Sequence, residues 1–114
     1  MLQLEKQKKG TNDLLRLIGE VDASNSLMLD QAIQELIQEG ISTLLIDGSK
    51  LNYISSAGLG VFMSYLEEFK EKGISLVIFG LNDQVKEVFK ILGLDKLIPL
   101  VNDQVAAEAH RHEV

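Results

Sequence analysis

The sequence lacks cysteine altogether and has a single proline among its 114 residues. Without cysteine the chain has neither disulfide bonds nor thiolate chemistry, so we expect it to work in the reducing cytoplasm. No apolar run approaches the roughly 20 residues that a membrane helix needs. The charged start, MLQLEKQKKG, has no room for the apolar segment of a signal peptide. We therefore expect a protein that stays in the compartment where it is made.

Basic side chains are scarce as well. The chain carries 17 Asp and Glu residues against 11 Lys and Arg residues, which gives a formal net charge of −6 at pH 7. This charge repels the phosphates of nucleic acids and the anionic surfaces of membranes. The composition thus disfavours nucleic acid and membrane partners and favours a partner with a basic surface.

The apolar residues switch repeatedly between a period of two and a period of 3.6, which is typical of strands interleaved with helices. At the start, LQLEK and LLRLIG flank the turn-forming QKKGTND and predict a hairpin. The predicted elements then alternate: helices at 24–39, 56–72 and 85–92, strands at 42–47, 74–80 and 97–101, and a closing helix at 103–111. The sequence predicts one α/β domain over residues 1–114, with a mixed sheet built from a hairpin followed by alternating helices and strands.

Three residues mark expected boundaries within this pattern. Ser24 is a candidate N-cap of the first helix, and Asp47 follows the dense apolar strand STLLI as its expected end. Pro99 cannot donate a ladder hydrogen bond, so the last strand is expected at an edge of the sheet.

The stretch YISSAGLGVF, residues 53–62, joins a predicted strand to a predicted helix and has three interpretations. A serine there can cap the helix, worth about 1 kcal/mol. A serine nucleophile would need a leading glycine and a histidine, and the only histidines are His110 and His112 near the C-terminus. A phosphoserine would suit the positive end of the helix dipole and its free N–H groups.

Other patterns argue against an enzyme or a cofactor site. The Gly58-Leu59-Gly60 run has no third glycine, which a dinucleotide loop requires. His110 and His112 have no third ligand nearby, so we predict no metal site. We expect no cofactor and no catalytic residue.

The run LLIDGSKLNYISSAGLGVF, with LIGEVDASNS before it and FGLNDQVKEVFKILGLDKLIPL after it, resembles the STAS domain of bacterial anti-sigma factor antagonists. The resemblance covers nearly the whole chain. In that family the anti-sigma factor is an ATP-dependent serine kinase, and it phosphorylates a serine just ahead of a Gly-x-Gly motif. On this chain Gly58 and Gly60 match the motif, and Ser56 falls on the phosphorylated serine.

The same resemblance implies the residues around the site. Asp22 falls on an acidic residue near the phosphorylated serine, and Asp47 at the end of the preceding strand. Two positions depart from the family pattern, because Ser55 replaces its usual aspartate and Ala57 replaces a serine or threonine. Ser55 is therefore the alternative phosphorylation site. The residues expected to bind the partner are Asp22, Asp47, Ser55, Ala57, Gly58 and Leu59.

The function that the resemblance implies is partner switching in the control of transcription. The unphosphorylated protein would bind an anti-sigma factor serine kinase and free a sigma factor, and phosphorylation of Ser56 would end the binding. A phosphatase is a further candidate partner, and we expect the free protein to be a cytoplasmic monomer. One alternative is a STAS subunit of a transport or sensory complex that binds proteins without phosphorylation. Another is a small-ligand or nucleotide-binding domain.

Overall fold

A five-stranded mixed sheet organises the protein, and the computed structural model describes residues 1–110. The order along the chain is β1 (Leu2–Lys9), β2 (Asn12–Val21), α1 (Ser26–Gln38), β3 (Thr43–Ile54), α2 (Ser56–Lys72), β4 (Ser75–Phe79), α3 (Asp83–Ile91), a short 3₁₀ helix η1 (Leu94–Lys96), β5 (Leu100–Val101) and α4 (Gln104–Ala109). The predicted hairpin followed by alternating helices and strands is confirmed.

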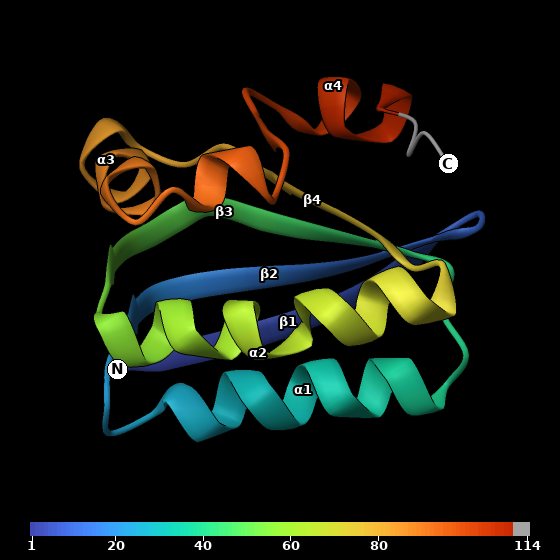
Figure 1. The fold of residues 1–114 in the computed structure, drawn as a ribbon, viewed down its shortest axis with the longest axis horizontal. Coiled ribbons are helices and arrows are strands. Elements are labelled where there is room, and N and C mark those ends of the chain that lie inside the picture. The colour runs from blue at the N-terminus through green and yellow to red at the C-terminus, as the bar shows by residue number, and fades with distance from the viewer. Residues whose placement is uncertain (111–114) are drawn as a thin grey trace.

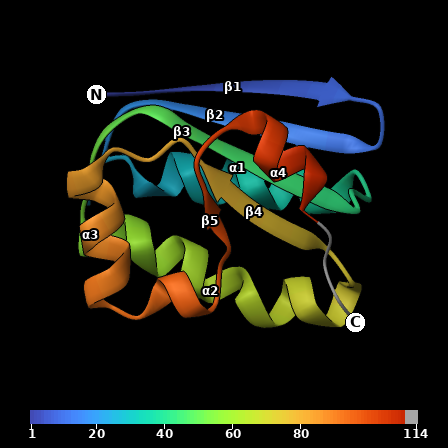
Figure 2. The same cartoon turned by 90° about the horizontal axis from the view of Figure 1, so that it is seen from above.

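The strands lie in sequence order across the sheet, β1-β2-β3-β4-β5. β1 is antiparallel to β2, and every later pair is parallel. Helices α1 and α2 cover one face of the sheet and α4 lies over the other (Figure 1). Seen from above, β1 lies along one edge, and α3 lies at the end of the sheet where β3 finishes (Figure 2). The two-residue strand β5 forms the other edge directly after Pro99, as expected.

Two apolar layers result from the alternation of side chains along the central strands. The larger layer joins the sheet to α1, α2 and α3, and the smaller one lies beneath Ala107 of α4. Leu44 and Ile46 enter the larger layer, whereas Leu45 enters the smaller one. This explains why β3 is apolar at consecutive positions, since both of its faces are buried there.

The structure corrects two expected boundaries. β3 continues to Ile54 and pairs with β2 as far as Val21, so Asp47 lies inside the strand and not at its end. The polar run GSKLN resembles a turn in composition, but it stays in the strand, with Gly48 and Leu51 buried and Ser49, Lys50 and Asn52 exposed. Helix α1 begins at Ser26 with Asn25 as its N-cap, so Ser24 lies in the preceding turn.

At the C-terminus, α4 ends at Ala109, two residues earlier than expected. His112, one half of the histidine pair noted in the sequence, lies outside the described residues.

Helix α3 packs on the rest of the protein through two buried side chains, Val85 and Phe89. Substitution of one of them therefore tests this packing directly. Phe89 is fully buried, and its ring centroid lies 6.2 Å from that of Phe62 in α2. We expect Phe89→Ala to lower the free energy of unfolding by about 3–5 kcal/mol, because a large cavity remains. Ile91 in the same helix is 73% exposed, so Ile91→Ala should change stability by less than about 0.5 kcal/mol. Urea unfolding of the two variants measures the difference, and equal losses would contradict this packing.

Candidate functional site

The carboxyl ends of β2 and β3 meet the start of α2 at one end of the sheet. Val21 and Ile54 are the last paired residues of these parallel strands. The backbone N–H of Ser55 donates to the carbonyl oxygen of Val21 over 2.8 Å, so α2 starts directly at the end of β2. In open α/β sheets, binding sites gather at the carboxyl ends of parallel strands.

Ser55 is the N-cap of α2. Its backbone is extended, and its Oγ accepts a hydrogen bond from the N–H of Gly58 over 3.4 Å. The capping interpretation of the serine pair therefore holds for Ser55. Its half-buried side chain is occupied by the helix that it starts.

Ser56 is the first residue of α2, and its side chain is exposed. Its Oγ forms no side-chain hydrogen bond within residues 1–110. The hydroxyl therefore stands free at the positive end of the helix dipole, where first-turn N–H groups favour an anion. Of the two serines, Ser56 is the one that an enzyme could reach.

Asp22 lies just beyond the end of β2, in the turn that leads to α1. Its Oδ1 accepts hydrogen bonds from the Oγ of Ser24 over 2.6 Å and from the Ser24 N–H over 2.9 Å. These bonds, the one from the hydroxyl above all, hold the pKa of Asp22 below its ordinary value. Because Val21 is bonded to Ser55, the structure brings this carboxylate to the same end of the sheet as Ser56.

The Gly-x-Gly run divides into a buried half and an exposed half. A Cβ on Gly58 would lie 2.6 Å from Cγ1 of Val21 and 2.7 Å from Cγ1 of Ile54, and Leu59 is buried. These two residues were expected to contact a partner, but the structure packs both of them into the core. Gly60 is exposed, and a Cβ there would meet no atom within 4 Å.

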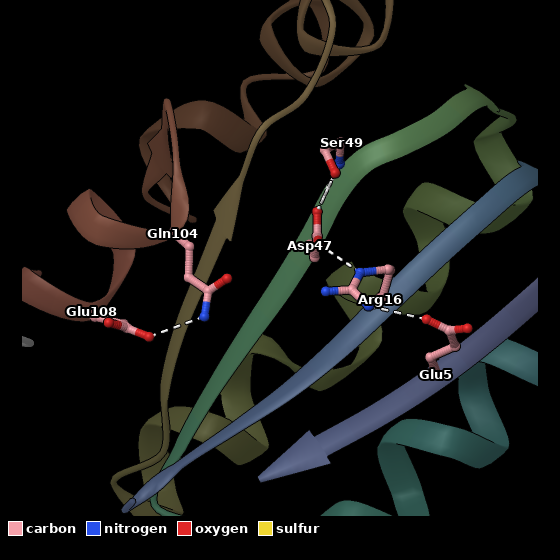
Figure 3. A network of polar contacts seen from close by, with 6 residues as sticks. All are labelled: Glu5, Arg16, Asp47, Ser49, Gln104 and Glu108. Carbon is pink, nitrogen blue, oxygen red and sulfur yellow. Dashed lines mark hydrogen bonds and ion pairs between the residues drawn. The ribbon is translucent and has the colours of Figure 1, made fainter. Parts of the chain in front are cut away.

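Asp47 lies elsewhere, in a polar network on the face of the sheet that α4 covers (Figure 3). It is only 4% exposed, and it accepts hydrogen bonds from Nε of Arg16 over 2.8 Å and from the Ser49 Oγ over 2.7 Å. Arg16 also donates to Glu5 of β1 over 3.0 Å. Asp47 pairs with Arg16 and Ile54 pairs with Val21, and the five steps of β2 between these partners span roughly 17 Å. The structure therefore does not bring Asp47 to Ser56, and its interactions tie β1, β2 and β3 together.

Two opposing effects set the pKa of Asp47. Burial raises the pKa of its carboxyl group, but the hydrogen bonds from Arg16 and Ser49 outweigh burial, so the pKa lies below its ordinary value. The carboxylate is charged at neutral pH.

The described residues hold no group of three His, Asp or Glu side chains that could bind a metal ion. No helix among residues 1–110 combines the length and the apolar character needed to span a membrane.

Comparisons with known proteins converge on one family. The STAS domain model matches residues 3–107. The anti-sigma-B factor antagonist of Listeria monocytogenes is 31% identical over 103 residues, which is 89% of this chain and 90% of that protein. Among solved structures, an anti-sigma factor antagonist from Mycobacterium paratuberculosis superposes with a TM-score of 0.83 at 24% identity, over 95% of this chain and 92% of that one.

A second structural match is the Bacillus cell fate determinant SpoIIAA in its phosphorylated form. Its TM-score is 0.71 at 20% identity, over 97% of this chain and all of that one. At these identities, the two structural matches establish the fold.

The two glycines of α2 should respond in opposite ways to an added methyl group. We expect Gly58→Ala to lower the free energy of unfolding by about 1–3 kcal/mol, because the methyl group overlaps Val21 and Ile54. Gly60→Ala should raise it by about 1 kcal/mol, because alanine favours a helix and the space is open. Thermal and urea unfolding report both signs, and stabilisation by Gly58→Ala would contradict the packing described here.

The buried carboxylate of Asp47 should make stability depend on pH. Because the folded pKa is lowered, the carboxylate stabilises the fold fully above the ordinary pKa of about 4, and this contribution is lost as pH falls through the folded value. Asp47→Asn should therefore cost about 1–3 kcal/mol at pH 7 and progressively less below about pH 4. Glu5→Gln, at the exposed end of the network, is the control and should cost at most about 1 kcal/mol. A loss for Asp47→Asn that stayed constant into acid would refute this origin.

Proposed function

The chain belongs to the STAS domain family, and we propose that it acts there as an anti-sigma factor antagonist controlled by phosphorylation of Ser56. The Listeria relative that bears this name matches nearly the full length of both chains. The observation that carries the proposal is the position of Ser56, exposed and without a hydrogen bond at the first turn of α2.

The choice of Ser56 over Ser55 rests on what each hydroxyl does in the folded chain. The Ser55 Oγ accepts the hydrogen bond that caps α2 and is half-buried. A phosphoryl group on Ser55 would displace that cap. The Ser56 Oγ is free, so a kinase can approach it without opening the helix.

Within the free protein, phosphorylation should hardly disturb the fold. The reaction forms an Oγ–P bond at Ser56 as ADP leaves, and the hydroxyl proton passes to a base of the kinase. The product carries about −1.5 to −2 charges. The N-terminus of α2 offsets this charge by roughly 0.3–1 kcal/mol, so the switch does not need a refolding event.

Within a complex, the same phosphate must lose its water. Desolvating it against a packed surface, with the carboxylate of Asp22 at the same end of the sheet, costs several kcal/mol. Unphosphorylated protein would thus bind the anti-sigma factor and free the sigma factor, and the kinase activity of the anti-sigma factor would end the binding. A phosphatase would restore the binding form in the cytoplasm, and the chain itself would act as a regulatory binding protein and not as an enzyme.

The test uses the purified anti-sigma factor of the same organism, the homologue of the anti-sigma-B factor. Incubation with this protein and ATP should add one phosphate, and peptide mass spectrometry should place it on Ser56. A penalty of about 3 kcal/mol weakens binding roughly a hundredfold, so calorimetric titration should show this loss for the phosphorylated form. The melting temperature should stay within about 3 °C of the unmodified value.

Two variants serve as controls. Ser56→Ala should fold, bind the anti-sigma factor and resist switching by ATP, whereas Ser55→Ala should still accept phosphate. Labelling of Ser55 alone would make it the regulatory serine. Binding of the anti-sigma factor that is unaffected by ATP would favour a STAS subunit that works without phosphorylation, and no binding at all would overturn the proposal.

A further inference from the structure

A hollow lies between α1 and α2, one helical turn beyond Ser56. The two helices run side by side on the same face of the sheet (Figure 1). The volume of the hollow is about 280 Å³, and its lining residues come from both helices: Ser26, Leu27, Asp30, Ala57, Gly60, Val61 and Ser64. The Tyr65 hydroxyl donates to the carbonyl oxygen of Asp30 over 3.2 Å, so a bond between the helices fixes the walls of the hollow. The hollow is preformed in the free protein.

Gly60 in this wall is a residue that the fold does not need. Its φ is not positive, and an added Cβ would meet nothing within 4 Å. A glycine inside a helix is less favourable than alanine at the same position. Glycine at position 60 therefore makes α2 less stable than alanine would. It also leaves the surface there without a side chain, so another molecule can approach the α2 backbone closely.

The stretch of chain that contains both walls of the hollow is strongly acidic. Of the chain's 17 acidic and 11 basic side chains, residues 17–69 hold eight acidic ones and a single basic one, Lys50. The rest of the chain is close to balanced, so the whole net charge of −6 originates in this segment. Asp30 lines the hollow and forms no ion pair within residues 1–110.

An apolar wall completes the hollow. Leu27 is 65% exposed at its rim, and Ala57 and Val61 form the opposite side. Lys and Arg side chains suit such a mixed surface, because their methylene stems pack on apolar groups while their charged heads find a carboxylate. A negatively charged or purely apolar side chain would leave Asp30 without compensation.

We propose that the hollow between α1 and α2 receives a basic side chain of the anti-sigma factor, whose stem lies across Gly60 and whose cation pairs with Asp30. This inference rests on the proposed function and adds the chemistry of the partner. It also extends the binding surface from the phosphorylation site onto α1, to residues that the motif does not contain.

Gly60→Ala gives the sharpest test, because stability and binding should move in opposite directions. The added methyl group should raise the melting temperature by about 4 °C. In titrations with the unphosphorylated pair of proteins, it should weaken binding of the anti-sigma factor at least tenfold by filling the hollow. A residue with only a structural role cannot give a more stable protein that binds more weakly.

Asp30→Asn tests the ion pair, with Glu67→Gln as its matched control. Glu67 is an exposed acid of α2 outside the lining of the hollow. Both variants remove one negative charge, but only Asp30→Asn should weaken binding about tenfold or more. It should also flatten the dependence of affinity on sodium chloride between 50 and about 300 mM, because a screened ion pair is lost.

The outcomes separate this inference from the proposed function. If the wild-type protein binds the anti-sigma factor and both Gly60→Ala and Asp30→Asn bind equally well, the function stands and the role of the hollow is refuted. If Glu67→Gln weakened binding as much as Asp30→Asn does, the contribution of Asp30 would be general charge attraction and not a specific ion pair, and the proposed pairing would be refuted. Loss of self-association in Gly60→Ala, measured by sedimentation, would assign the hollow to a second copy of the chain. Absence of wild-type binding would overturn both proposals.

Discussion

The close packing of Gly58 against Val21 and Ile54 is the constraint on which the rest of the site depends. It brings the backbone of α2 against the last residues of β2 and β3, where any larger residue would overlap two side chains. The hydrogen bond from the Ser55 N–H to the Val21 carbonyl oxygen fixes the same junction. Once this contact is made, the cap position falls on Ser55, and the next residue, Ser56, emerges into solvent.

The acidic side chains on the two faces of the sheet have different surroundings. On the α4 side, Glu5, Arg16 and Asp47 join three strands through paired charges. On the α1–α2 side, Asp22 is held by its own turn and Asp30 is unpaired within the described residues. The acidic side chains therefore differ between the faces: those on the α4 side form ion pairs, whereas Asp30 on the α1–α2 side forms none within the described residues. The net charge of the chain does not distinguish these two cases.

The sequence predicted the order and type of the elements because the apolar stripes and the turn residues are strong local signals. It placed Asp47 wrongly because GSKLN resembles a turn, and only the pairing of β3 with β2 up to Val21 keeps that run in the strand. It assigned Gly58 and not Gly60 to the partner-binding surface, since no local pattern says which side of α2 meets the core. The hollow beside Asp30 joins residues more than 25 positions apart, and only the packing of α1 on α2 creates it.

Phosphorylation of Ser56 can regulate binding without unfolding the protein only if the fold does not depend on the Ser56 hydroxyl. The hydroxyl makes no bond within residues 1–110, and Gly58 and Ser55 supply the packing and the cap that start the helix. A charge added to Ser56 is therefore compensated locally by the helix dipole in the free protein, whereas in a complex it must lose water. In the proposed switch, phosphorylation therefore changes the free energy of binding and leaves the free energy of unfolding almost unchanged. We infer the same separation of stability from binding at Gly60, where glycine weakens the helix and leaves the surface of α2 open.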